Sequence, residues 1–530
     1  MTAPTNGVFD RPQGADPYAP EPGNAGKKTG IIITLALVAA LVIGGGAFAV
    51  TRVLGGGGDQ PSSALPGGSA AYVRMDIDPS VGQKIAAVRF LKDLDPEVTA
   101  TLESDDMRRE FFEMIAEDEP SLSNIDYDTD IEPWLGDRLG VGVVPQGEDE
   151  PQVAVALQVT DEGAAEEGLT KLFEASEGSD QAGWFFHGDY VVLSSAEMID
   201  DVQAGVEAGT LAENETFTGD IEALGDEGVL SFWADGEQLA PYLDDAEGAL
   251  DGVPDPTGMS GVAGPGAIGG FLSGSTLDEA QTGRVAAAVR FGEDHIELHG
   301  ITRGFPVQIE DGDTAQLVQD LPEDTAVAFG QEHGDQLVAI AFEQMNKAMP
   351  DEMAQMQSEA SAQGFEIPGD IQTLVGQSLA IGVGPQIAEI DQIDDPSQIP
   401  AVIRVQTDTD AANAVIDKAV VAAGATPEDL EAYVVRRVDD GVLSLGLSQD
   451  YVDSAVAGGL GDNPTFQSAV PNAAEADSVF YVDLNAFEQY YLSEITDENT
   501  RASVEQIAAV GMSATWSGEN GEFTLRVVAD

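Results

Sequence analysis

The strongest hydrophobic pattern in the chain is an uninterrupted apolar run near its N-terminus. Residues 30–50 read GIIITLALVAALVIGGGAFAV, and no charged residue occurs between Thr29 and Thr51. A helix needs roughly 20 apolar residues to cross a hydrocarbon core about 30 Å thick. The pattern therefore predicts one transmembrane helix over residues 30–51.

The charges beside this run predict its orientation. Lys27 and Lys28 precede it, and Arg52 alone follows it. Because the more basic flank stays in the cytoplasm, we expect residues 1–29 inside and everything after Arg52 outside. Residues 1–29 are rich in Pro, Gly, Ala and Asn without apolar periodicity, which predicts a disordered tail.

A cleaved signal peptide is the alternative interpretation of the same run. Ala47-Phe48-Ala49 has the A-x-A form of a cleavage site. The apolar run is nevertheless longer than the roughly 7–15 residues of a signal peptide. We therefore favour an uncleaved anchor and leave cleavage after Ala49 open.

After a glycine-rich linker over residues 52–63, the hydrophobic pattern occurs twice. Residues 130–145, DIEPWLGDRLGVGVVP, align without gaps with residues 370–385, DIQTLVGQSLAIGVGP, and seven of the sixteen positions are identical. The same order of strands, helices and hairpins surrounds both blocks. A long-period repeat of this kind indicates an internally duplicated module, with extracytoplasmic copies at residues 64–305 and 316–530.

Period-two alternation predicts antiparallel strands in each copy. Phe523, Leu525 and Val527 alternate with polar residues, and in the first copy Ile296 and Leu298 do the same. We expect these apolar side chains to face the core and the polar ones a wet face. Asp440-Gly441 and Asn520-Gly521 are typical type I′ hairpin turns. With amphipathic helices between the strands, the predicted fold class is α+β, each copy an antiparallel sheet with helices on one face.

Composition narrows the possible functions. The chain has 530 residues, 22 Lys+Arg and 95 Asp+Glu, which gives a formal charge of −73. Nucleic-acid binding needs clustered basic residues, so it is excluded. The absence of cysteine excludes disulfides, thiol catalysis and Cys-ligated metals.

The anchor, the glycine-rich spacer, the first strand ALPGGSAAYVRMDIDP and the block DIEPWLG resemble the domain of unknown function 3352 family. These are envelope proteins found in actinobacteria and cyanobacteria. The resemblance covers residues 64–530 and supports the fold. It implies no activity, ligand or catalytic residue.

Two motifs, one rich in glycine and one acidic, have the spacing of known binding sites. Gly264, Gly266 and Gly269 form a GxGxxG, but no strand precedes it and no capped helix follows it, as a dinucleotide site requires. Asp126, Asp128, Asp130 and Asp137 have the spacing of a calcium loop. At position six of this loop, Ile131 replaces the glycine that a calcium loop requires. At position twelve, the side chain of Asp137 is shorter than the glutamate that binds calcium through both carboxylate oxygens. We expect a solvated acidic turn in which Asp130 caps the next helix.

His295, Glu297 and His299 lie on one face of a predicted strand. Residues four apart on a strand are about 13 Å apart, so the three side chains cannot bind one zinc ion together. We expect a wet sheet face instead.

Four methionines form the most informative apolar feature outside the anchor. Met345, Met349, Met353 and Met356 recur at helical spacing, interrupted by Pro350, which would kink the helix or start a new one. We expect core packing, at least for Met345. The alternative is an adaptable apolar surface for a lipid-like ligand or a partner.

These observations predict a single-pass membrane protein with a duplicated α+β module outside the cell. We expect a non-catalytic binding or interaction role at the cell envelope. The expected partners are the membrane and either an apolar ligand or an envelope protein, and the oligomeric state stays open. Alternatives are a carrier of lipid-like molecules, an enzyme of unrecognised class and a structural, solvating protein. The sequence singles out no catalytic, cofactor-binding or metal-binding residue.

Overall fold

The structure is a computed structural model that describes residues 59–77, 124–146, 149–175, 182–242, 283–304, 317–387, 395–493 and 498–530, with isolated residues between them. The predicted tail, transmembrane helix, most of the linker, and the GxGxxG at 264–269 lie outside these ranges. Within the described ranges, no helix has the length and apolar character needed to cross a membrane.

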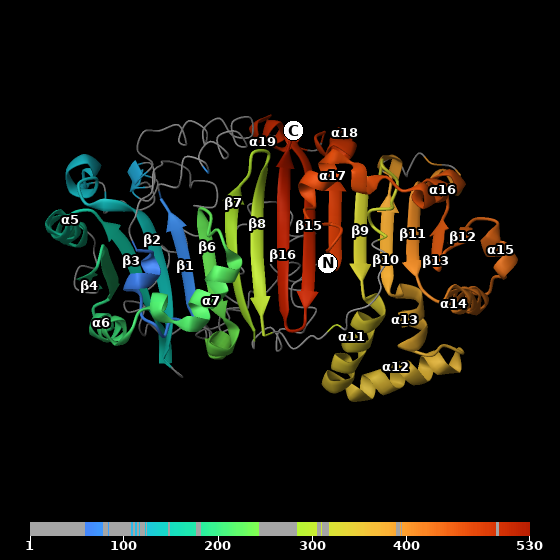
Figure 1. Ribbon diagram of the computed structural model, residues 1–530, viewed down its shortest axis with the longest axis horizontal. Coiled ribbons are helices and arrows are strands. Elements are labelled where there is room, and N and C mark those ends of the chain that lie inside the picture. Colours follow the sequence, from blue (N-terminus) through green and yellow to red (C-terminus); the bar gives the residue numbers. More distant parts are fainter. Residues whose placement is uncertain are drawn as a thin grey trace, which may run out of the picture.

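The described strands form one antiparallel sheet of 16 strands (Figure 1). From its outer edge inward, the first half contributes β4 (Ala182–His187), β5 (Tyr190–Ser195), β3 (Asp149–Val159), β2 (Leu135–Gln146), β1 (Ala71–Asp76), β6 (Leu230–Asp235), β7 (Arg284–Phe291) and β8 (His295–Arg303). The second half contributes β12 (Val435–Asp439), β13 (Val442–Gly446), β11 (Ala401–Gln406), β10 (Ser378–Val383), β9 (Val327–Glu332), β14 (Ser478–Asp483), β15 (Ile507–Ser517) and β16 (Asn520–Ala529). The α+β class with antiparallel pairing is confirmed.

The two halves meet where β8 pairs with β16, which we call the seam. The pairing runs from Arg303 opposite Asn520 to His295 opposite Val528. The sequence predicted one sheet for each copy, and the structure joins them into a single sheet. The alternation of apolar and polar residues along a strand shows which side chains share a face. It does not show which strand is the neighbour in the sheet, so the pairing of β8 with β16 was not predictable.

Four helices pack on one side of the sheet, which we call the helix-covered face. They are α6 (Ile199–Ala208), α7 (Glu215–Leu224), α16 (Gln449–Ala457) and α17 (Pro464–Ala469), and Figure 1 shows α7, α16 and α17 over the strands. Val192 of β5 belongs to the core cluster under α6 and α7, and Val528 of β16 belongs to the cluster under α16 and α17.

The prediction that helices cover only one face of the sheet was wrong. Val191 of β5 points away from Val192 and joins a cluster with Leu169 of α5 (Glu162–Ala175). At the other end, Arg436 of β12 contacts Asp417 of α14 (Thr409–Ala422) on that same side. Helices therefore lie on both faces at each end of the sheet.

A helical arm separates β9 from β10. It consists of α11 (Gly334–Ala348), α12 (Pro350–Ala362) and α13 (Gly369–Val375). Pro350 starts α12 rather than continuing α11, as its missing N–H requires. The remaining helices are α15 (Pro427–Glu431), α18 (Glu488–Tyr491) and α19 (Glu498–Glu505), with short turns η2 (Pro61–Ala64), η4 (Tyr127–Ile131), η6 (Leu211–Glu213), η8 (Pro396–Gln398), η9 (Leu460–Asp462) and η10 (Asn485–Phe487).

One of the two predicted hairpin turns is confirmed. Asp440 and Gly441 both have positive φ, at 47° and 80°, as a type I′ turn requires. The second turn lies two residues earlier than predicted, because Ser517 pairs with Asn520 and leaves Gly518 and Glu519 as the loop. Gly518, with φ 62°, supplies the positive φ there.

Candidate functional site

One continuous apolar row crosses the face opposite the helix-covered face. Each member lies directly opposite its neighbour on the next strand, so all members point to the same side. Every strand except the edge strand β12 contributes one apolar residue to this row: Phe186, Val191, Leu157, Leu139, Met75, Leu230, Val289, Leu298, Leu525, Met512, Phe480, Phe329, Ile381, Ile403 and Leu445. At a strand spacing of about 4.8 Å the row is roughly 70 Å long.

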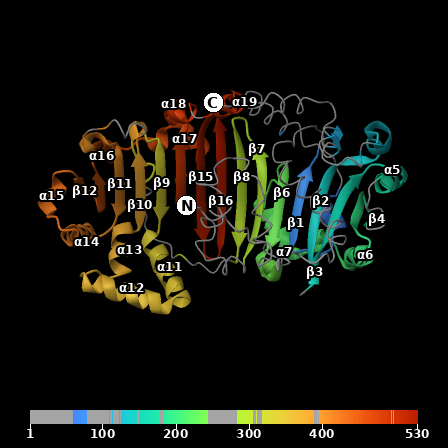
Figure 2. The ribbon, with the colours of Figure 1, turned by 180° about the vertical axis from the view of Figure 1, so that it is seen from behind.

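A second line of β-branched residues widens this face in the second half. Val383, Val327, Val482, Val510 and Val527 again lie directly opposite one another on β10, β9, β14, β15 and β16. We call the surface made by the row and this line the apolar face, and Figure 2 shows the sheet from behind. The alternation of apolar and polar residues is visible on single strands, but it does not show that the apolar positions lie in register across the sheet.

The apolar face is more open on β10 and β11 than on the matching strands of the first half, β2 and β3. Val155 and Val141 of the first half are only 8% and 6% exposed. The residues at the same places in the second half, Ile403 and Ile381, are 41% exposed and half-buried. Phe329 and Phe480 beside them are half-buried, and so are Val73 and Phe232 at the same places in the first half. The second half therefore offers apolar side chains that a ligand can reach.

The methionine stripe divides between core and surface. Met353 is buried, whereas Met349 and Met356 are 46% and 43% exposed. Met345, which we expected in the core, is only half-buried. Because α11 ends before Met349, the four side chains do not share one helical face, and the arm presents two of them at its surface.

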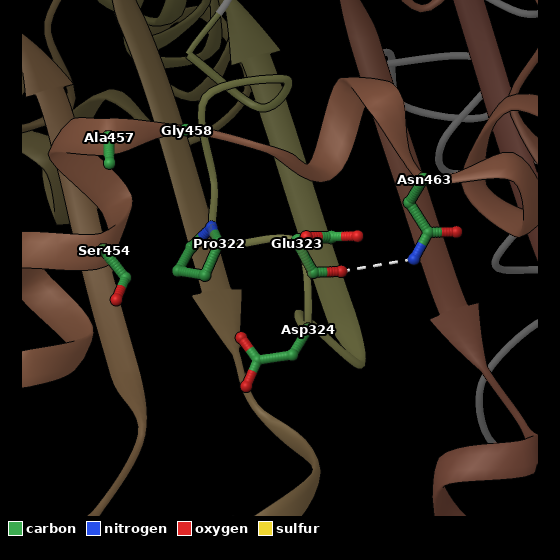
Figure 3. A pocket seen from close by; sticks show the side chains of 7 residues that line it. All are labelled: Pro322, Glu323, Asp324, Ser454, Ala457, Gly458 and Asn463. Carbon is green, nitrogen blue, oxygen red and sulfur yellow. Dashed lines mark hydrogen bonds between the residues drawn. The ribbon is translucent and has the colours of Figure 1, made fainter.

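A cavity of about 530 Å³ lies on the second half, between α16 and the turn before β9 (Figure 3). Asn463 donates a hydrogen bond from Nδ2 to the backbone oxygen of Glu323, at 3.2 Å. Glu323 and Asp324 are exposed at its rim, and none of the lining residues is basic: Pro322, Glu323, Asp324, Ser454, Ala457, Gly458 and Asn463. The cavity is open to solvent.

The acidic turn at Asp126–Asp130 forms ion pairs. Asp130 is 7% exposed and accepts a bond from Lys171 Nζ at 2.5 Å, and this bond lowers the pKa of the carboxyl group. Asp126 caps η4 by accepting from Thr129 N, and Asp128 pairs with Arg109. The prediction of a solvated Asp130 as helix cap was wrong, because Lys171 on α5 reaches it. Among the described residues, no group of three or more His, Asp or Glu side chains could hold a metal.

His295, Glu297 and His299 lie on the helix-covered face, where Ile301 of the same strand joins the core. The expected wet face was therefore wrong, and Ile296 and Leu298 point to the apolar face instead. Glu297 pairs with Arg526 and Arg290, and His299 Nδ1 lies 3.1 Å from Thr524 Oγ1. These groups connect strands at the seam and do not converge on one point.

A buried group at the base of the arm has the residue types of a hydrolase. Ser378 Oγ donates to Glu332, and His333 Nε2 lies 3.5 Å from an Asp477 carboxylate oxygen. Ser378 is completely buried and Glu332 is 3% exposed. A nucleophile must reach its substrate, so this arrangement is suited to holding β9, β10 and the start of α11 together.

A family model described as "Protein of unknown function (DUF3352)" matches residues 31–183. The resemblance inferred from the sequence is thereby confirmed over these residues. No curated protein matches the chain.

Among solved structures, "Structure of crystal form IV of TP0453" is 7% identical, covers 47% of this chain and 83% of its own, and has a TM-score of 0.23. "Structure of crystal form I of TP0453" is 7% identical, covers 48% and 83%, and has a TM-score of 0.22. Similarity at this level supports no conclusion about fold or function.

Proposed function

We propose that this chain, assigned to the DUF3352 family by its residues 31–183, is a non-catalytic binding module that takes up lipid-like molecules on the apolar face of its sheet. The observation that carries the proposal is the in-register apolar row, which is most open at Ile403 of β11. Large apolar surfaces on a folded protein typically mark a site of interaction. The occupant we propose is an acyl chain.

Charge favours an acyl chain over an acidic partner. The chain carries a formal charge of −73, which repels anionic proteins and lipids over roughly 10 Å at 0.1 M salt. The row itself consists of aliphatic and aromatic side chains, which offer an acyl chain dispersion contacts and no hydrogen bonds. A flexible hydrocarbon chain needs nothing more from its site.

We infer that the module is duplicated, as the sequence repeat predicts. The strand order is the same in both halves. Asn214 and Asn463 each accept bonds from the N–H groups two and three residues later. Lys171 and Lys418 each bind the aspartate of the aligned block, Asp130 and Asp370, at 2.5 and 2.6 Å. Duplication followed by divergence would explain why Ile403 is more exposed than Val155 at the same place in the first half.

We propose from the sequence alone that the chain is anchored in the cell membrane. The apolar run at residues 30–51, with the more basic flank before it, supports a single-pass anchor with the module outside the cell. Protease added to intact cells is expected to digest the chain after Arg52 and to spare the tail. Activity of a cytoplasm-dependent reporter fused to the C-terminus would contradict this topology.

The binding proposal is tested with hexadecane that carries a terminal pyrene, titrated into the full chain held in amphipol. We expect saturable binding, weakened at least tenfold by Ile403→Glu, which places a charge on the apolar row. Tyr433→Glu is the matched control, because Tyr433 is 66% exposed and lies outside the row. Absence of saturable binding by the unaltered chain would overturn the proposal.

A further inference from the structure

The apolar face contains one pair of polar side chains in its second half. Gln331 on β9 and Ser478 on β14 are direct cross-strand partners. They lie two residues along their strands from Phe329 and Phe480, which are also partners, so both pairs point to the same face. The distance between the two pairs along the strands is about 7 Å.

The first half has apolar residues at the corresponding places. There the pair Val73 and Phe232 takes the position of Phe329 and Phe480, and the next pair on the same face is Met75 and Leu230. The polar pair is therefore a property of the second half. Burying two polar side chains within an apolar surface is unfavourable unless their hydrogen bonds are satisfied.

The hydrogen bonds of this pair use all its donors. Ser478 Oγ donates to Gln331 Oε1 at 2.7 Å. Gln331 Nε2 donates to the backbone oxygens of Glu332 and Asp477, at 2.8 and 3.2 Å. A glutamine amide has two N–H donors and a serine hydroxyl has one. What remains are lone pairs on Gln331 Oε1 and Ser478 Oγ, so the pair can only accept a further hydrogen bond.

We propose that the acyl-chain ligand ends in an uncharged hydrogen-bond donor, a hydroxyl group, which donates to the Gln331–Ser478 pair while the chain lies along Phe329 and Phe480. A carboxylate is excluded by the same chemistry, because it only accepts and carries the charge sign of the protein. Gln331 is half-buried and Ser478 is 4% exposed, so Gln331 is the member of the pair that a ligand on the apolar face would contact. This inference rests on the function proposed above and adds the chemical class of the ligand.

The test compares three probes that differ only at one end: pyrene-labelled hexadecane, hexadecanol and hexadecanoate. The unaltered full chain in amphipol is expected to bind the alcohol about five- to tenfold more tightly than the hydrocarbon, which is the effect of one net hydrogen bond. It is expected to bind the carboxylate more weakly than either.

The decisive variant is Gln331→Met with Ser478→Leu, which places in the second half the residue types of the first-half pair Met75 and Leu230. It is expected to bind hydrocarbon and alcohol equally. Ser478→Ala is a milder variant, expected to reduce the preference for the alcohol. Ser444→Ala is the matched control, because Ser444 is 2% exposed on the helix-covered side of β13 and should leave the preference unchanged. Thermal unfolding checks that each variant is folded.

The results distinguish the proposed binding of acyl chains from the proposed recognition of a terminal hydroxyl group. Equal binding of alcohol and hydrocarbon by the unaltered chain, or a preference that survives in the double variant, overturns this inference and leaves the proposed function in place. Failure of all three probes to bind the unaltered chain overturns both.

Discussion

Glu297 on β8 accepts two hydrogen bonds from Arg526 on β16, from Nε at 2.9 Å and from Nη2 at 2.8 Å. Both side chains are largely buried on the helix-covered face, and 229 residues separate them in the chain. Arg526 also donates to Ser468 O in α17, and Arg290, the second partner of Glu297, donates to Leu224 O in α7. The pair thus connects the two halves and the ends of two helices.

Removing this charge is expected to destabilise the whole sheet. Glu297→Gln should lower the free energy of unfolding by about 2–3 kcal/mol, because hydrogen bonds to charged groups contribute that much. A double-mutant cycle with Arg526→Met in chemical denaturation measures the coupling. The exposed pair Glu343 and Lys347 on α11 is the control, with an expected coupling of about 0.5 kcal/mol or less. Equal couplings for the two pairs would contradict this role of the seam.

His299 gives the seam a pH dependence. Burial lowers its pKa, and the nearby Arg290 lowers it further, against the opposite effects of Glu522 and Glu297. Because the folded state then binds the proton less readily than the unfolded state, stability is present above the unfolded pKa of about 6.5 and is lost as the pH falls below it. The denaturant concentration at the unfolding midpoint should decrease as the pH is lowered from 7.5 to 5.5. The decrease should be smaller in His299→Gln. An identical fall in this variant would show that other groups cause it.

Met353 is the methionine of the arm whose loss should matter. It is 1% exposed, so Met353→Ala leaves a cavity and should cost about 2–5 kcal/mol. Met356→Ala, on the same helix and 43% exposed, should cost less than about 0.5 kcal/mol. Thermal unfolding of the two variants makes the comparison, and similar melting temperatures would show that the arm does not pack as described.

The two asparagine caps should contribute equally to stability. Asn214 accepts from Thr216 N and Phe217 N, and Asn463 accepts from Thr465 N and Phe466 N. Replacing either by alanine should cost about 1–2 kcal/mol. Chemical denaturation of both single variants measures this, and a large cost at one site with none at the other would argue against equivalent halves.

Local features of the fold were predictable from the sequence, and long-range ones were not. Asp440-Gly441 predicts its hairpin because both residues tolerate positive φ, and Pro350 predicts the break after α11. Leu298 and Leu525 show the alternation of a strand, but their sequence does not reveal that they lie opposite one another. The Gln331–Ser478 pair was missed for the same reason, since each residue alone is an ordinary polar position. Lys171 reaches Asp130 only because α5 packs over η4, which no spacing along the chain indicates.

The seam has a consequence for how the chain is made. β8 is complete at residue 303, but its partner β16 begins at residue 520. During synthesis, β8 therefore remains an unpaired sheet edge until β16 has been made. Such edges invite pairing with other chains, and growing domains are exposed to misassembly in this interval. Shielding this edge of the first half until β16 is made would limit such misassembly.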